Sequence, residues 1–171
     1  MLHEVLHLAA VALAAVAACV HPGWRRKAAA VDLAAVIAML VAMVNVTYAS
    51  APVWSIALLG AAMALAAWRS PRSRRQRTVA PRSCAVPHTA LGLVATAAIL
   101  PLMAGGMPAE VLGHAGHGAS AGALVAVVLG VAGCHAGASV LASVREVHTL
   151  SRIQHVLMGG TTLLMAATVI A

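Results

Sequence analysis

The first residues of the chain hold two histidines at a spacing that suits a shared metal ion. His3 and His7 stand four positions apart in the segment His-Glu-Val-Leu-His, and residues i and i+4 of a helix lie on the same face. The segment also matches the HExxH motif of zinc peptidases, in which the glutamate, here Glu4, is the general base. Almost no chain precedes the motif from which a substrate cleft could be built, so a peptidase is the least favoured hypothesis.

A second pair of histidines follows in a glycine-rich segment further along the chain. Imidazole and carboxylate donors suit Zn²⁺ or Cu²⁺, so we predict one outer metal site that joins both groups, with copper favoured. Its candidate ligands are His3, Glu4, His7, Glu110, His114 and His117. The site requires ring nitrogens of the two groups to lie within about 4 Å of each other, because metal–nitrogen bonds are about 2.0–2.1 Å. The alternative is that these histidines are only polar residues of the membrane surface.

Spaced methionines form the second candidate set. Thioether sulfur selects Cu(I), and methionines below an outer histidine cluster would form a route for a soft metal ion. The candidate residues of this route are Met39, Met43, Met103, Met107 and Met165. The alternative is that these flexible side chains only fill gaps in the core.

Three ionisable residues fall inside apolar segments, where such residues are costly and by default functional. His135 is a candidate for an interhelical hydrogen bond, a haem or metal ligand, or part of a proton path. Asp32 and His155 stand near the starts of their segments. Asp32 has the alternative of pairing with the basic run 25–27.

The chain that carries these residues is too apolar for a soluble domain. Of its 171 residues 62% are hydrophobic and 9% charged, and the mean hydropathy is +0.94, against about 45–50% and 25% in soluble domains. A transmembrane helix needs about 20 mostly apolar residues. We therefore predict an all-α, polytopic membrane protein with a single domain (1–171) of six transmembrane helices. The predicted spans are about 2–20, 28–50, 53–68, 88–107, 121–144 and 155–171.

Charge predicts the orientation of this bundle. All 11 Lys and Arg residues fall in the connections 21–27, 69–87 and 145–154, which six spans place on one side. The positive-inside rule makes that side cytoplasmic, so both termini are predicted outside and the protein in the plasma membrane. Topology explains the net charge of +7 without a nucleic-acid partner. The arginines of 69–87 are expected to lie on the anionic headgroups of the lipid bilayer.

Part of the chain resembles the DUF5134 family of small actinobacterial membrane proteins. The resemblance rests on the basic turn, helix start, spaced methionines and Pro-Val-Trp hairpin of Arg25 to Trp68, and on His155 followed by Met158 and Met165 in the last span. It departs from the family at Asp32, where a histidine is expected. The family has no established activity, so the resemblance implies a multi-helix membrane protein and no catalytic residue.

Small residues motivate a second hypothesis of a different class. Helices rich in Ala and Gly let backbones approach closely, and Gly133 and Gly137 form a GxxxG, which we expect to pack within the bundle. Such faces also suit a structural or accessory subunit of a larger membrane complex, with another membrane protein as partner and no chemistry of its own. Copper or zinc content distinguishes this hypothesis from the metal-binding one.

Overall fold

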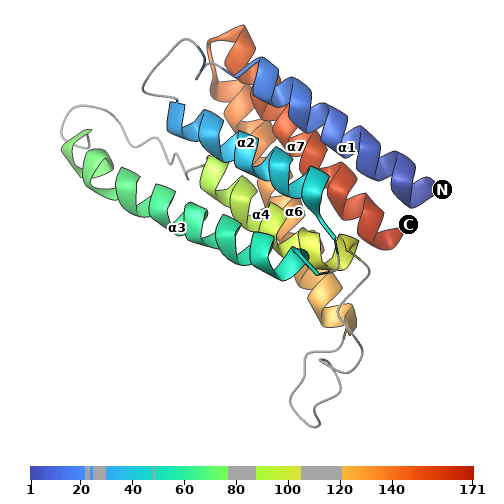
Figure 1. Ribbon diagram of the computed structural model, residues 1–171. Helices are drawn as coiled ribbons and strands as arrows, with labels where there is room; N and C mark the ends of the chain where they lie inside the picture. The colour runs from blue at the N-terminus through green and yellow to red at the C-terminus, as the bar shows by residue number, and fades with distance from the viewer. Residues whose placement is uncertain (22–23, 25–29, 48, 77–87, 105–120) are drawn as a thin grey trace.

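The described part of the chain is all α-helical. The computed structural model describes residues 1–21, 24, 30–47, 49–76, 88–104 and 121–171, and these form six helices. The helices are α1 (Leu2–Cys19), α2 (Ala30–Asn45), α3 (Ala51–Gln76), α4 (His88–Met103), α6 (Ala121–Arg145) and α7 (Thr149–Ile170). Figure 1 shows them as one bundle in which successive helices run in opposite directions. The predicted all-α class is confirmed.

Four of the six helices are long and apolar enough to cross a membrane: α1, the stretch Ala51–Trp68 of α3, α6 and α7. α2 and α4 are apolar but have 16 residues each, which is about 24 Å at 1.5 Å per residue, against a hydrocarbon thickness of about 30 Å. Each of the six predicted spans therefore coincides with an apolar helix, and four of these helices have the length of a span.

The interior of this bundle contains polar side chains beside its apolar core, and many large aliphatic side chains face outwards. Its buried residues include His135, Ser139 and Ser143 on one face of α6, whereas Val140 and Val144 of the same helix are 61% and 70% exposed. Hydroxyl groups in the interior and large aliphatic groups outside indicate that lipid surrounds the helices. This distribution of polar and aliphatic side chains is typical of an integral membrane protein, in agreement with the composition.

The two ends of the chain lie together. α1 packs along α7 and also contacts α2. Its buried residues Ala10, Ala14 and Ala17 have small side chains, which allow close approach. At the end of this contact, the Nδ1 atom of His3 donates a hydrogen bond to the Thr168 carbonyl, at 3.0 Å. Figure 1 shows the N- and C-termini at the same end of the bundle, as an even number of antiparallel helices requires.

α4 is the central helix. It packs against α2, α3, α6 and α7, and Leu93, Ile99 and Leu100 are completely buried. A hydrogen bond from Ser55 Oγ to the Ala97 carbonyl, at 2.8 Å, joins α3 to α4. Because α4 is surrounded by other helices, its residues are the ones best placed to build a site inside the bundle.

Three sequence expectations are corrected. The segment predicted as a loop from residue 69 continues α3 to Gln76, and α7 begins at Thr149, not at 155. Gly133 and Gly137 do not pack within the bundle, because a Cβ added at either would meet nothing within 4 Å. The glycine that brings two helices together is Gly159 of α7, where an added Cβ would lie 2.8 Å from Ser139 Cβ of α6.

Candidate functional site

Three imidazoles from three helices meet in the interior. The ring centroids of His88 (α4) and His135 (α6) are 4.7 Å apart, and those of His88 and His155 (α7) are also 4.7 Å apart. His135 is completely buried, and His88 and His155 are partly buried. We call these three residues the histidine cluster.

The hydrogen bonds of two hydroxyl groups determine where the ring protons of the cluster lie. Thr162 Oγ1 donates to the Met158 carbonyl at 3.1 Å and also contacts His135 Nδ1 at 2.8 Å. A hydroxyl has one hydrogen, so Thr162 must accept from His135, whose proton is therefore on Nδ1. By the same argument Ser139 Oγ, which donates to the His135 carbonyl at 2.8 Å, accepts from His88 Nε2 at 2.6 Å.

This arrangement leaves lone pairs inside the bundle. His135 Nε2 carries no proton, is buried and has no hydrogen-bond partner, and His155 Nδ1 is also buried without one. A buried polar group without a partner costs about 1–3 kcal/mol. Metal-binding histidines typically donate one ring N–H to an oxygen, so that the other nitrogen faces the ion. His135 has this arrangement.

The space beside His135 Nε2 exists because residue 92 is glycine. A Cβ added at Gly92 would lie 3.1 Å from His135 Nε2 and 3.6 Å from the Cε methyl of Met158. The end of the Met158 side chain and the His135 ring thus both border the position that this Cβ would take. One side-chain carbon at position 92 would occupy this space.

His21 and Asp32 lie near the cluster at the end where α1 stops and α2 starts. Burial lowers the pKa of His21; the negative charge of Asp32 opposes this shift and His155 adds to it. His21 is 3% exposed and is neutral at pH 7. Asp32, predicted as an intramembrane polar residue, is partly buried in the first turn of α2.

The outer candidates on α1 line a groove of about 650 Å³. His3, Glu4 and His7 form its wall together with Met103 at the end of α4. Because the Thr168 carbonyl can only accept, His3 carries its proton on Nδ1 and has a free lone pair on Nε2. His7 Nδ1 is buried without a hydrogen-bond partner. We call this region the outer groove, after the predicted orientation of the bundle.

The remaining outer candidates, Glu110, His114 and His117, and also Met107, lie outside the described residues. Their predicted approach to His3 and His7 is therefore still a prediction. Within the described ranges, no three His, Cys, Asp or Glu side chains are arranged as they stand to hold one ion.

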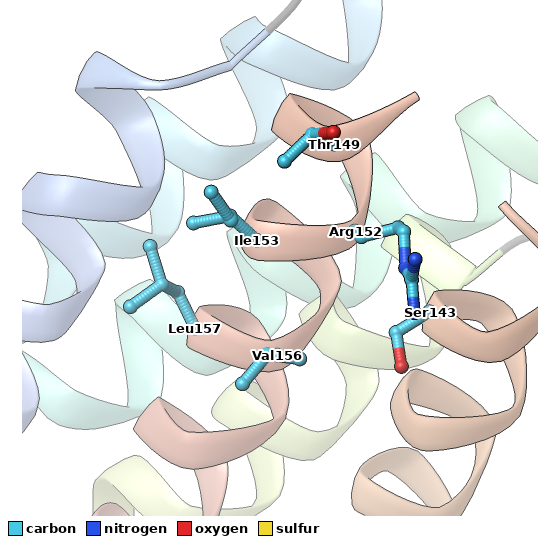
Figure 2. Close-up of a pocket in the computed structure, with 6 residues that line it drawn as sticks. All are labelled: Ser143, Thr149, Arg152, Ile153, Val156 and Leu157. Atoms are coloured by element: carbon cyan, nitrogen blue, oxygen red, sulfur yellow. The ribbon is translucent and has the colours of Figure 1, made fainter. Parts of the chain in front are cut away.

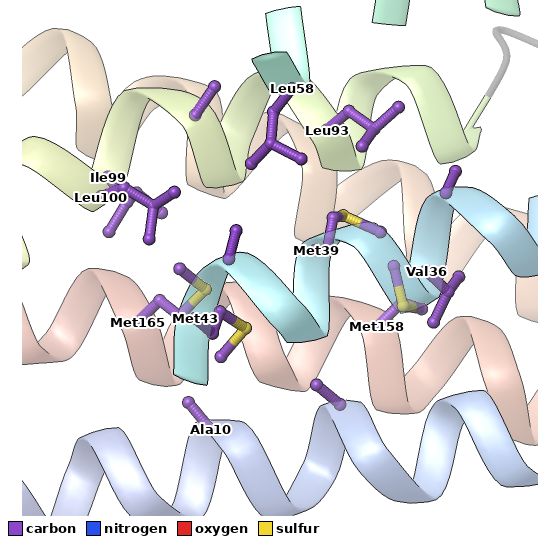
Figure 3. Packing of buried hydrophobic residues seen from close by; sticks show 14 of the residues in the cluster. Ala10, Val36, Met39, Met43, Leu58, Leu93, Ile99, Leu100, Met158 and Met165 are labelled. Carbon is purple, nitrogen blue, oxygen red and sulfur yellow. The ribbon is translucent and has the colours of Figure 1, made fainter. Parts of the chain in front are cut away.

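Four predicted methionines, Met39, Met43, Met103 and Met165, belong to one buried core, together with Met158. Figure 3 shows Met39 and Met43 of α2 and Met165 of α7 entering the same interior space. Met43 is 1% and Met165 0% exposed. The core that joins them extends from Met103 at the outer groove to Met158 beside the histidine cluster.

A second groove, of about 350 Å³, lies at the other end of the molecule (Figure 2). Ile153, Val156 and Leu157 of α7 form its aliphatic wall, and Arg152 extends towards Ser143 of α6. An aliphatic surface with one cation suits lipid and supplies no metal ligand.

His88 is the member of the histidine cluster that was not predicted as a site residue. Topology placed it on the same side as His155, but it is the first residue of α4 and contacts His135, ten residues before the end of α6. At 1.5 Å per residue that is about 15 Å from this end. The sequence did indicate that His88 and His155 lie on the same side of the bundle. It did not indicate how deep in the bundle α4 begins, and therefore not that His88 contacts His135.

In comparisons with known proteins, no family model, no curated protein and no solved structure matches the chain.

Proposed function

We propose that this integral membrane protein binds and handles a transition metal ion, with copper favoured, and that the outer groove is its entry site. One observation carries the proposal: His3 is anchored through Nδ1 to Thr168, which leaves its Nε2 lone pair available one helical turn from His7. Two imidazoles on one helix face suit Cu or Zn. Glu4, which lines the same groove, is 77% exposed and adds a carboxylate.

The methionine core favours copper over zinc. Thioether sulfur is a soft ligand that selects Cu(I), and a continuous core joins the groove residue Met103 to Met43, Met165 and Met39. In this proposal these side chains pack the interior and also offer sulfur donors below the groove.

The outer groove is tested by the double variant His3→Asn/His7→Asn of the full chain, purified in detergent and loaded with copper. We expect the affinity for copper in the groove to fall at least about tenfold, because even the loss of a residue that only supports a metal ligand lowers affinity about 10–100-fold. The measurement is copper content per chain after desalting, with a chelator titration for affinity.

His148→Asn is the matched control, because His148 is exposed in the turn before α7. The control should keep the copper content of the unmodified chain. Equal copper content in the double variant and the control would remove the outer groove as a site.

We also propose that all six helices cross the membrane, with both termini outside. The antiparallel order of the helices supports this orientation. So does the location of all Lys and Arg within 21–27, 69–87 and 145–154, which are the three predicted connections and the helix ends beside them. Cys84, in the Cys19→Ser/Cys134→Ser background, should react with a membrane-impermeant maleimide only after cells are permeabilised. Labelling of Cys84 in intact cells would reverse the orientation or change the number of spans.

A structural role in a larger membrane complex is the second candidate function. The observation that favours it is the open glycine face of α6, where Cβ atoms added at Gly130, Gly133 and Gly137 would meet nothing within 4 Å. Small residues let another membrane helix approach closely. A metal-free protein that co-purifies with a partner in mild detergent would favour this role over metal handling.

A further inference from the structure

The histidine cluster has the properties of a binding site that the sequence analysis did not predict as a unit. Three helices each contribute one imidazole, and the buried hydroxyl groups of Ser139 and Thr162 contact two of the three rings. Intramembrane ionisable residues are costly, and three in contact are hard to explain by packing alone.

We propose that His88, His135 and His155 form an intramembrane site for a single Cu(I) ion, with His135 Nε2 as its principal ligand. The inference takes its choice of copper from the proposed function, but its residues are independent of the outer groove. The available donors are the unprotonated Nε2 of His135, Nδ1 of His88 and the unpartnered Nδ1 of His155.

The centroid spacing of the rings fits such a site, but the rings of His88 and His155 must rotate to direct a nitrogen at a common ion. Two imidazoles on one ion have centroids roughly 5 Å apart, given metal–nitrogen bonds of about 2.0–2.1 Å, and both observed separations are 4.7 Å. The donor atoms do not yet converge. Binding therefore turns the rings of His88 and His155, while the Thr162 hydrogen bond holds His135 in place.

The charge of the site favours a monovalent ion. Three imidazoles supply no negative charge, and burying a divalent cation without compensation is costly. Among the described acidic residues, Glu4 lies in the outer groove. Asp32 lies in the first turn of α2 and Glu146 directly follows α6, close enough to act electrostatically on His21 and His155 respectively, but neither is one of the three proposed imidazole ligands. Met158, whose side chain borders Gly92 as the His135 ring does, is the nearest candidate for a soft sulfur donor, which favours Cu(I) over Zn²⁺.

Thr162 is the positioning residue of this site. Its hydroxyl accepts the His135 Nδ1 proton and thereby keeps Nε2 unprotonated. Loss of such an outer hydrogen bond typically lowers metal affinity 10–100-fold. Thr162→Val keeps the side-chain shape without the acceptor, whereas Thr162→Ser keeps the acceptor.

The test uses the full chain in detergent, loaded with Cu(I) under anaerobic reducing conditions and titrated against a Cu(I) chelator. We expect His135→Asn to lose about one copper per chain, Thr162→Val to bind 10–100-fold more weakly, and Thr162→Ser to match the unmodified protein. Zn²⁺ should not displace this copper. His148→Asn is the control, because it removes an exposed histidine outside both proposed sites and should leave Cu(I) binding unchanged.

X-ray absorption at the copper edge keeps the proposal falsifiable if His135→Asn fails to fold. The His3→Asn/His7→Asn variant, in which the histidine cluster is intact, should show imidazole scattering from the copper that remains bound. Retention of that copper in folded His135→Asn would overturn the inner site and leave the outer groove standing. The absence of copper from the His3→Asn/His7→Asn protein would also overturn it, and would leave the histidines as a proton path.

Discussion

Gly92→Ala is expected to weaken Cu(I) binding at the histidine cluster without unfolding the protein. The added carbon would lie 3.1 Å from His135 Nε2 and 3.4 Å from Cε1 of the same ring, next to the nitrogen that is proposed to bind the ion. These neighbours are side-chain atoms, so the fold accommodates the methyl group by small shifts, whereas a metal–nitrogen bond of about 2.0–2.1 Å has no such tolerance. We expect at least a tenfold loss of affinity, equivalent to about 1.4 kcal/mol.

The measurement is a Cu(I) chelator titration of Gly92→Ala beside Gly130→Ala. A Cβ at Gly130 would meet nothing within 4 Å, so this control changes the same residue type in a helix without touching a site. Copper at the outer groove should be unchanged in both variants. Unchanged Cu(I) affinity in Gly92→Ala would show that no ion lies beside His135 Nε2.

Gly159→Ala is expected to have the largest effect on stability. Its Cβ would lie 2.8 Å from Ser139 Cβ, and 3.6 Å from the backbone Cα of Ala136, so α6 and α7 would have to move apart. Overpacking of this kind costs about 1–3 kcal/mol, which corresponds to a fall in Tm of roughly 2–12 °C at this chain length. Thermal unfolding in detergent, followed by circular dichroism, measures the change.

A double-mutant cycle identifies the cause of this loss. If the two Cβ atoms clash, Ser139→Gly should recover part of the stability in the Gly159→Ala background, although it lowers stability alone. Gly133→Ala is the control, because its Cβ would point into open space, and its Tm should stay the same or rise. Purely additive effects of the two substitutions would exclude the contact as the cause.

The apolar segments were sufficient to predict the all-α class and the approximate positions of the six helices. Long apolar segments leave water for the bilayer, where they form helices, because every backbone N–H and C=O group there needs an internal hydrogen-bond partner. The six helices therefore lie where the apolar segments were, and an even number of them brings His3 to Thr168. Helix ends were less predictable: α3 extends through residues 69–76, since arginine is itself a good helix former.

Only the tertiary structure shows which helix faces contact one another. The GxxxG of Gly133 and Gly137 lies on the open face of α6, whereas Gly159 and Gly92 have close neighbours on another helix. Both kinds of glycine look alike in a sequence, because the helical period tells which residues share a face but not what that face contacts.

The candidate sites divide in the same way. The i, i+4 spacing of His3 and His7 is local, so the sequence alone could place both on one face of α1, and the methionines four apart could be assigned to one side of α2. The histidine cluster combines residues 88, 135 and 155 from three helices. It depends on α4 beginning level with the middle of α6, a relative position set by side-chain packing between helices and encoded in no local pattern.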